Sequence, residues 1–202
     1  MLKVYSDQGS GNCYKVRLLL RQLDVPFEVV ETSVLRGEQR TPGYLEKNFN
    51  GKVPMVEFED GACLPESGAI LYHFAQGSPL WPDDRMDQSR VLQWMCFEQY
   101  SHEPQIAVAR FWCHYLNAEE QYAEPLKEKR EKGYHALDVM ERHLAHNDFF
   151  AAGRYTVADI ALYAYTHVAH QGGFDLAGYP AVRAWLDRVA SRPGHITIDE
   201  IC

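Results

Sequence analysis

The sequence lacks an excess of basic residues. Its 20 Lys and Arg side chains are outnumbered by 28 Asp and Glu side chains, which gives a formal net charge of −8. Residues 1–77 carry 8 basic and 10 acidic side chains, and the rest of the chain carries 12 and 18. Because nucleic acids and anionic membranes are bound mainly through Lys and Arg, we expect neither half to bind them.

Long apolar runs and clustered metal ligands are missing as well. No stretch approaches the roughly 20 apolar residues that cross a bilayer, and the N-terminus does not resemble a secretory signal. His167 and His170 are three residues apart, but no carboxylate or cysteine completes a site with them, so no metal is expected. The five cysteines form neither a C-x-x-C pair nor a zinc-ligand spacing, and they are Cys13, Cys63, Cys96, Cys113 and Cys202. We therefore expect a protein of the reducing cytoplasm.

The first third of the chain alternates strand and helix patterns. Short β-rich runs, an Asp60-Gly61 turn and apolar residues at helical spacing follow one another. Their order is β-α-β, then a loop, then β-β-α, which predicts a parallel pair with a hairpin edge. Residues 1–77 are therefore interpreted as a thioredoxin-like α/β domain, with strands at 2–5, 27–31, 53–58 and 62–64 and helices at 12–23 and 66–76.

The remainder of the chain has only helical patterns. Two prolines among residues 78–83 mark a linker. Beyond it, residues 84–202 are predicted to form an all-helical domain. Thr156 and Asp159 have the spacing of a capping box before an apolar run, which favours a structural role. The predicted helical segments are 83–116, 119–146, 157–170 and 178–191.

The most informative motif combines Lys52-Val53-Pro54 with Glu66-Ser67, twelve residues after Pro54. Glu66-Ser67 opens a predicted helix, whose first N–H groups lack partners and carry the positive end of the helix dipole. A carboxylate is stabilised there, the Ser67 hydroxyl adds a hydrogen bond, and Glu66 suits an ammonium. A plain helix cap is the alternative for an isolated Glu-Ser pair.

A Val-Pro strand start, an Asp-Gly hairpin, a Pro-Glu-Ser-Gly-Ala-Ile helix start and a helical second domain occur here in that order. In this the whole chain resembles the cytosolic glutathione transferase family. The resemblance implies that Glu66 and Ser67 hold the γ-glutamyl end of glutathione and Lys52 the glycyl carboxylate. It also implies a cis Val53–Pro54 bond, with the Val53 backbone pairing with the cysteinyl part as an added strand does.

Glutathione must become a thiolate to attack a substrate. A free thiol of pKa near 8.5 is only a few per cent ionised at pH 7, and lowering that pKa by two units takes about 2.7 kcal/mol. A helix N-terminus and one hydrogen-bond donor are sufficient to lower the thiol pKa by this amount. Ser10, which matches the serine of theta- and zeta-like classes, is preferred over Asn12, which matches a nu-like asparagine. Tyr5 and Cys13 remain alternatives, and Ser10 as a plain N-cap is another.

The resemblance further implies thiolate attack on a small electrophile, bound in a pocket to which Phe111, Trp112 and Tyr115 contribute. A nu-like glutathione-dependent peroxidase or disulfide reductase and a zeta-like isomerase are the enzymatic alternatives. An adaptor that keeps the fold, as starvation proteins do, is the non-enzymatic one. Such enzymes are commonly homodimers, in which Phe49 is either an anchor in the partner subunit or packed on its own domain.

Overall fold

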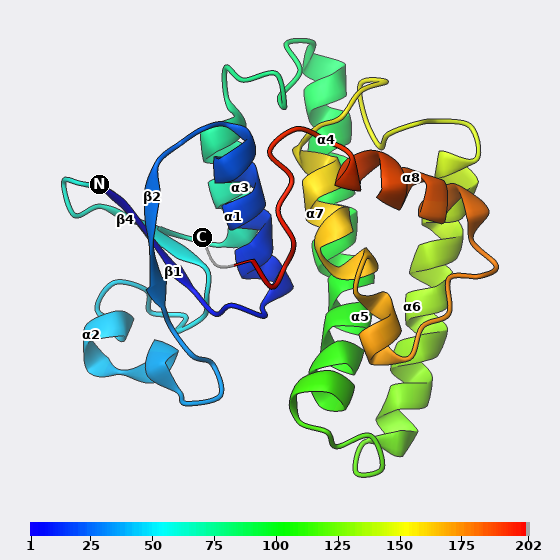
Figure 1. Cartoon of the computed structure of the whole chain (residues 1–202), viewed down its shortest axis with the longest axis horizontal. Helices are drawn as coiled ribbons and strands as arrows, with labels where there is room; N and C mark the ends of the chain where they lie inside the picture. Colours follow the sequence, from blue (N-terminus) through cyan, green and yellow to red (C-terminus); the bar gives the residue numbers. More distant parts are fainter. Residues whose placement is uncertain (201–202) are drawn as a thin grey trace. The chain divides into compact units, whose positions relative to one another are not determined.

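The computed structural model describes residues 1–200 and divides the chain into two compact units. One unit comprises Met1–Leu80 together with the chain from Pro193 onward, and the other is Trp81–Arg192 (Figure 1). The sequence placed the boundary at residues 78–83 and assigned everything after it to the helical domain. The structure differs there, because residues 193–200 belong to the first unit.

The first unit contains the expected mixed four-stranded sheet. The strands are β1 (Leu2–Ser6), β2 (Phe27–Glu31), β3 (Met55–Glu57) and β4 (Cys63–Pro65), in the order β2-β1-β3-β4. β1 runs parallel to β2, whereas β3 is antiparallel to both β1 and β4. The predicted third strand is shorter than expected at its start, because Pro54 has no N–H to donate to a ladder.

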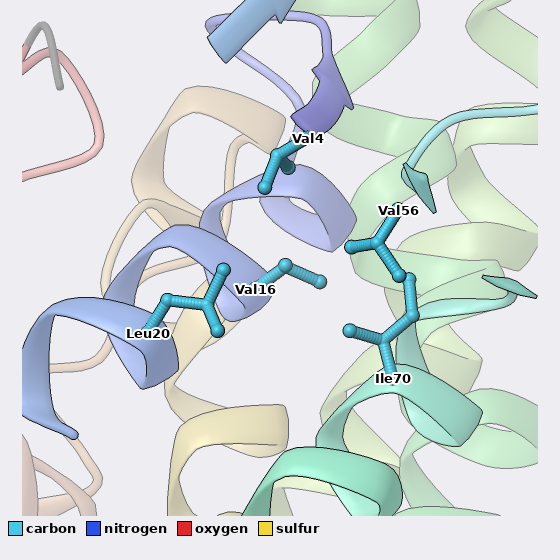
Figure 2. Close-up of a cluster of buried hydrophobic side chains, with 5 residues drawn as sticks. All are labelled: Val4, Val16, Leu20, Val56 and Ile70. Carbon is cyan, nitrogen blue, oxygen red and sulfur yellow. The ribbon is translucent and has the colours of Figure 1, made fainter. Parts of the chain in front are cut away.

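Two helices pack on one face of this sheet. They are α1 (Gly11–Gln22) and α3 (Ser67–Ala75), close to the predicted 12–23 and 66–76. The apolar cluster between them and the sheet consists of Val4 and Val56 from the strands, Val16 and Leu20 from α1, and Ile70 from α3 (Figure 2). Since successive strand residues point to opposite faces, the side chain of the residue after Val4 lies on the other face of the sheet.

The polar loop after β2 holds two short elements that the sequence did not reveal. They are the 3₁₀ turn η1 (Glu38–Arg40) and the single-turn helix α2 (Pro42–Leu45). A four-residue helix is too short to show apolar periodicity. It nevertheless positions the next loop, because the Tyr44 hydroxyl donates to the Lys52 carbonyl at 2.7 Å and Asn48 Nδ2 donates to the same oxygen at 2.8 Å.

The second unit is helical, as expected. The predicted segment 83–116 is divided into α4 (Arg85–Phe97), the π-helical turn η2 (Glu98–His102), α5 (Glu103–Arg110) and the π-helical turn η3 (Phe111–Tyr115). Pro104 cannot donate a backbone hydrogen bond, and its ring crowds the preceding turn, which matches the wider turn directly before α5. The remaining elements are α6 (Ala123–Leu144), α7 (Val157–Thr166), η4 (Ala169–Gly172) and α8 (Pro180–Ala190). Within residues 1–200, no helix has the length and apolar character needed to span a membrane.

Candidate functional site

The turn before α1 is held by a network of hydrogen bonds. Ser10 N donates to the Asp7 carbonyl at 3.1 Å, and the Asp7 carboxylate accepts from Gly9 N at 3.3 Å and from Val34 N at 2.8 Å. Ser10 is the N-cap of α1, and its Oγ accepts from Cys13 N at 3.3 Å. Accepting this bond uses a lone pair of Oγ, so the cap itself leaves the hydroxyl able to act as a donor. Capping and catalysis are therefore compatible at Ser10.

The start of α3 forms a second part of the candidate site. Glu66 is the N-cap residue and has a φ of 72°, a left-handed conformation that costs a non-glycine residue about 1–3 kcal/mol. Its carboxylate is exposed and accepts from Asn50 Nδ2 at 3.3 Å. Ser67 follows as the first helical residue and is 5% exposed. The strained backbone at Glu66 thus turns a charged side chain outward beside the first N–H groups of α3, for which the helix itself offers no acceptors.

The structure brings these two starts together. Ser67 Oγ donates to Asn12 Oδ1 at 3.2 Å, although the two residues are 55 positions apart in the chain. Lys15 Nζ donates to the same Asn12 oxygen at 2.7 Å, and the Lys15 side chain is buried. Because Oδ1 is committed to these two donors, the group of Asn12 that suits an anionic ligand is its amide nitrogen.

Lys15 was not identified as a site residue from the sequence. Its position three residues after Asn12 on a predicted helix was the available clue, since residues three apart lie on one helix face. By sequence alone, Lys15 cannot be distinguished from an ordinary lysine on a helix surface. Only the structure shows it to be 1% exposed and bonded to Asn12.

The Lys52-Val53-Pro54 segment has the expected local geometry. The Val53–Pro54 peptide bond is cis, which confirms that expectation. The Lys52 side chain is exposed, while its carbonyl is held by Tyr44 and Asn48. Val53 is half-buried and stands two residues before β3, ahead of the ladder pair Tyr5↔Met55.

The two other candidates for stabilising the glutathione thiolate, Cys13 and Tyr5, have environments that do not suit this role. Cys13 is fully buried, its Sγ accepts from Asp7 N at 3.3 Å, and burial raises the pKa of its thiol to about 11. Tyr5 lies on the sheet face opposite Val4, where its hydroxyl donates to Glu57 Oε2 at 2.6 Å and accepts from Lys47 at 2.7 Å. Burial and the Glu57 carboxylate raise the pKa of Tyr5. Cys13 is therefore shielded from a ligand, and the Tyr5 hydroxyl hydrogen is already donated to Glu57.

The aromatic candidates of the second unit cluster in and around η3. Phe111 stacks with Tyr115 at a centroid distance of 5.8 Å, and Trp112 stacks with Tyr122 at 4.5 Å. The Arg110 guanidinium lies 5.1 Å from the Tyr115 ring centroid. All three candidate side chains are half-buried, so each is partly accessible within this cluster.

The expected capping box at the start of α7 is confirmed. Thr156 Oγ1 accepts from Ala158 N, and the Asp159 carboxylate accepts from Thr156 N at 2.9 Å. The same carboxylate also accepts from Phe150 N at 3.1 Å and from Trp185 Nε1 at 3.0 Å. This box therefore links three parts of the second unit and has a structural role there.

No group of three metal-ligating side chains occurs among residues 1–200. His167, one of the two histidines noted in the sequence, instead lies with Nδ1 at 2.8 Å from the Tyr163 carbonyl and stacks on the Tyr163 ring.

Two family models match the chain. The model of the glutathione S-transferase N-terminal domain covers residues 1–76, and that of the glutathione S-transferase C-terminal domain covers residues 105–193. Among solved structures, a possible glutathione S-transferase from Rhodopseudomonas palustris is 52% identical, with a TM-score of 0.97 over 100% of this chain and 99% of that one. A structure of Ure2p in complex with glutathione is 25% identical, with a TM-score of 0.82 over 96% and 91%.

More distant relatives carry different names. Protein URE2 of Meyerozyma guilliermondii is 26% identical over 96% of this chain and 77% of its own length. The disulfide-bond oxidoreductase YfcG of Escherichia coli is 26% identical over 90% of this chain and 87% of its own length. Across these matches, the two family models and the fold agree along most of the chain. The chain therefore belongs to the glutathione S-transferase family.

Proposed function

We propose that this protein is a glutathione transferase, in which the thiolate of bound glutathione attacks a small electrophilic molecule. A carbon–sulfur bond forms and the leaving group departs with the electron pair of the bond that breaks. The observation that carries the proposal is the 3.2 Å hydrogen bond between Ser67 Oγ and Asn12 Oδ1. It joins the start of α3, suited to the γ-glutamyl end, to the start of α1, suited to the sulfur.

The glutathione site is proposed to use four residues for binding. Because the Ser67 hydroxyl donates its hydrogen to Asn12, the Ser67 backbone N–H and its neighbours at the start of α3 take the γ-glutamyl carboxylate, and Glu66 takes the ammonium. The Val53 backbone pairs with the cysteinyl part, and Lys52 takes the glycyl carboxylate. The exposed charges of Glu66 and Lys52 and the ordered backbone around Val53 support this assignment.

Two residues are proposed to donate hydrogen bonds to the glutathione thiolate, Ser10 by its hydroxyl and Asn12 by its amide nitrogen. The buried thiol of Cys13 and the engaged hydroxyl of Tyr5 favour this pair over the other candidates. The test is a titration of bound glutathione by thiolate absorbance in Ser10→Ala and Asn12→Ala. The variant whose bound thiol has the higher pKa identifies the main donor. An unchanged thiol pKa in both variants would exclude the pair.

A second function is favoured by the same asparagine. The chain resembles YfcG, named a disulfide-bond oxidoreductase, and Asn12 matches the nu-like pattern. In that reaction the glutathione thiolate attacks a disulfide sulfur, and one half of the substrate leaves as a thiolate. A second glutathione thiolate then attacks the glutathione sulfur of the mixed disulfide, which gives oxidised glutathione and releases the other half of the substrate as a thiolate. Rates with an aryl halide, an organic hydroperoxide, a mixed disulfide and a cis-configured diacid, measured side by side, separate transferase, peroxidase, reductase and isomerase. If calorimetry detects no glutathione binding, all the enzymatic functions are excluded and the non-enzymatic adaptor remains.

We also propose that the enzyme works as a cytoplasmic homodimer, with a small-molecule electrophile as the second substrate beside glutathione. The Phe49 ring supports dimerisation, because it is 91% exposed on the loop after α2. An exposed aromatic side chain of this size suits insertion into a second subunit. Sedimentation of the native chain and of Phe49→Ser checks this, and a monomeric native protein would contradict it.

A further inference from the structure

The chain after α8 returns to the first unit and follows α1. Figure 1 shows this red C-terminal segment beside the blue helix. Gly194 has a φ of 70°, and a Cβ there would lie 3.2 Å from Gln22 Cα, so the backbones make close contact near the end of α1. The Ile196 carbonyl accepts from the Tyr14 hydroxyl at 2.7 Å. The segment thus runs antiparallel to α1, toward the turn that precedes it.

The segment ends on Gln8, two residues before Ser10. Gln8 Nε2 donates to the carbonyls of Ile198 and Glu200, both at 3.0 Å. Gln8 Oε1 accepts from Arg17 Nη1 at 2.6 Å, and the main-chain carbonyl of Gln8 accepts from Arg17 Nη2 at 2.8 Å. Both the side chain and the backbone of Gln8 are therefore held.

Arg17 connects the helix, the turn and the C-terminal segment. Its side chain is fully buried, and Nη2 also donates to the Ile198 carbonyl at 3.0 Å. A planar guanidinium holds several acceptors in one fixed arrangement, which the single ammonium of a lysine does not. The buried side chains of Ile196 and Ile198 add apolar contact to the same segment.

We propose that Arg17, Gln8 and the segment from Gly194 to Glu200 form a positioning device for Ser10. This inference rests on the proposed glutathione site. By holding the carbonyl and side chain of Gln8, the device fixes the backbone that leads into Ser10, and with it the direction of the hydroxyl and of the first α1 N–H groups. The C-terminal residues thereby affect thiolate formation without touching the ligand.

Two variants separate positioning from simple charge. Gln8→Ala keeps the Arg17 cation but removes the side chain that joins the turn to the segment. Arg17→Lys keeps a cation but loses the paired donors. We expect both to raise the pKa of bound glutathione by about one unit and to lower kcat/KM about tenfold, because small displacements of a catalytic group have effects of this order. If Arg17→Lys does not fold, Gln8→Ala decides.

Tyr14→Phe is the matched control. It removes one hydrogen bond to the same segment, at Ile196, and leaves Gln8 and Arg17 unchanged. It should lower the melting temperature by a few degrees and leave the pKa of the bound thiol at the native value. Folded Gln8→Ala and Arg17→Lys proteins with native thiol pKa values would overturn the inference, as would a Tyr14→Phe shift equal to that of Gln8→Ala.

A second readout compares the native protein with Gln8→Ala. If an ordered C-terminal segment favours glutathione binding, bound glutathione must favour the ordered segment by the same free energy. Saturating glutathione should therefore slow the release of C-terminal residues by carboxypeptidase severalfold in the native chain, and less in Gln8→Ala. Equal release rates with and without bound glutathione would contradict the inference. A native chain that fails to bind glutathione would instead refute the proposed function.

Discussion

Lys15 Nζ donates to Asn12 Oδ1 at 2.7 Å, within one turn at the start of α1. The Lys15 side chain is 1% exposed. A buried cation is weakly screened by salt, so its field reaches nearby groups more strongly than that of a surface lysine. The pair therefore joins a fixed positive charge to the amide that is proposed to face the glutathione sulfur.

We predict that Lys15→Met raises the pKa of bound glutathione by about one unit, because a nearby cation favours the thiolate. Thiolate absorbance against pH measures the shift. Lys47→Met is the control, since Lys47 bonds Tyr5 and Glu57 on the other face of the sheet. A thiol pKa that moves equally in both variants would show that only overall charge matters.

Glu66→Gln should weaken glutathione binding about tenfold with little change in kcat, because a hydrogen bond to a charged group contributes about 1.5–3 kcal/mol. Calorimetry with glutathione and with its N-acetyl derivative tests the assignment to the ammonium. The native protein should bind the acetylated tripeptide poorly, and Glu66→Gln should discriminate less between the two. Equal discrimination in both proteins would place the ammonium elsewhere.

Tyr5→Phe should leave kcat/KM within about twofold of native, since its hydroxyl bonds Glu57 and Lys47 on the opposite sheet face. The loss of these bonds should lower the free energy of unfolding by about 1 kcal/mol. Steady-state kinetics measure kcat/KM, and urea unfolding measures the free energy of unfolding. A hundredfold loss of kcat/KM in a folded variant would return Tyr5 to the list of thiolate donors.

Asp159→Ala should destabilise the second unit by about 3–5 kcal/mol, because it leaves the buried donors of Thr156, Phe150 and Trp185 without their acceptor. Urea unfolding followed by Trp fluorescence measures the loss. Asp175→Ala is the control, because this exposed carboxylate accepts from Ala177 N in a local turn, so only a small effect is expected.

Asp159 also predicts a pH dependence. Burial raises the pKa of its carboxyl to about 6, against the opposing effect of its hydrogen-bond donors. The native state then binds this proton more tightly than the unfolded state, whose pKa is near 3.9. Its contribution to stability is therefore largest below about pH 4 and declines as the pH rises to about 6. Between about pH 4 and pH 6, the free energy of unfolding of Asp159→Asn should depend less on pH than that of the native protein. The same pH dependence in both proteins would contradict the prediction.

The local patterns of the sequence are sufficient to predict the α/β and helical halves and the capping box, whereas the cis Val53–Pro54 bond is implied only by the family resemblance. The two halves and the capping box depend on neighbouring residues: alternation, helical spacing, a turn pair, a cap. The sequence does not predict the short helix α2, because four residues carry no periodicity. It does not predict the π-helical turns either, because they continue a helical pattern. The starts of α1 and α3 are also predicted to within one residue, since each combines a polar cap, Ser10 or Glu66, with the apolar run that follows.

Which side chains meet was decided only by the tertiary structure. The Asn12–Ser67 bond spans 55 residues, and the Gln8–Ile198 bond spans 190. No local pattern encodes either, because each depends on how the sheet and helices pack. The proposed glutathione-binding residues follow from the sequence and its family resemblance, whereas the buried Lys15 beside Asn12 and the return of the C-terminal segment to Gln8 required the folded chain. Burial and long-range hydrogen bonding, rather than residue type, set those roles.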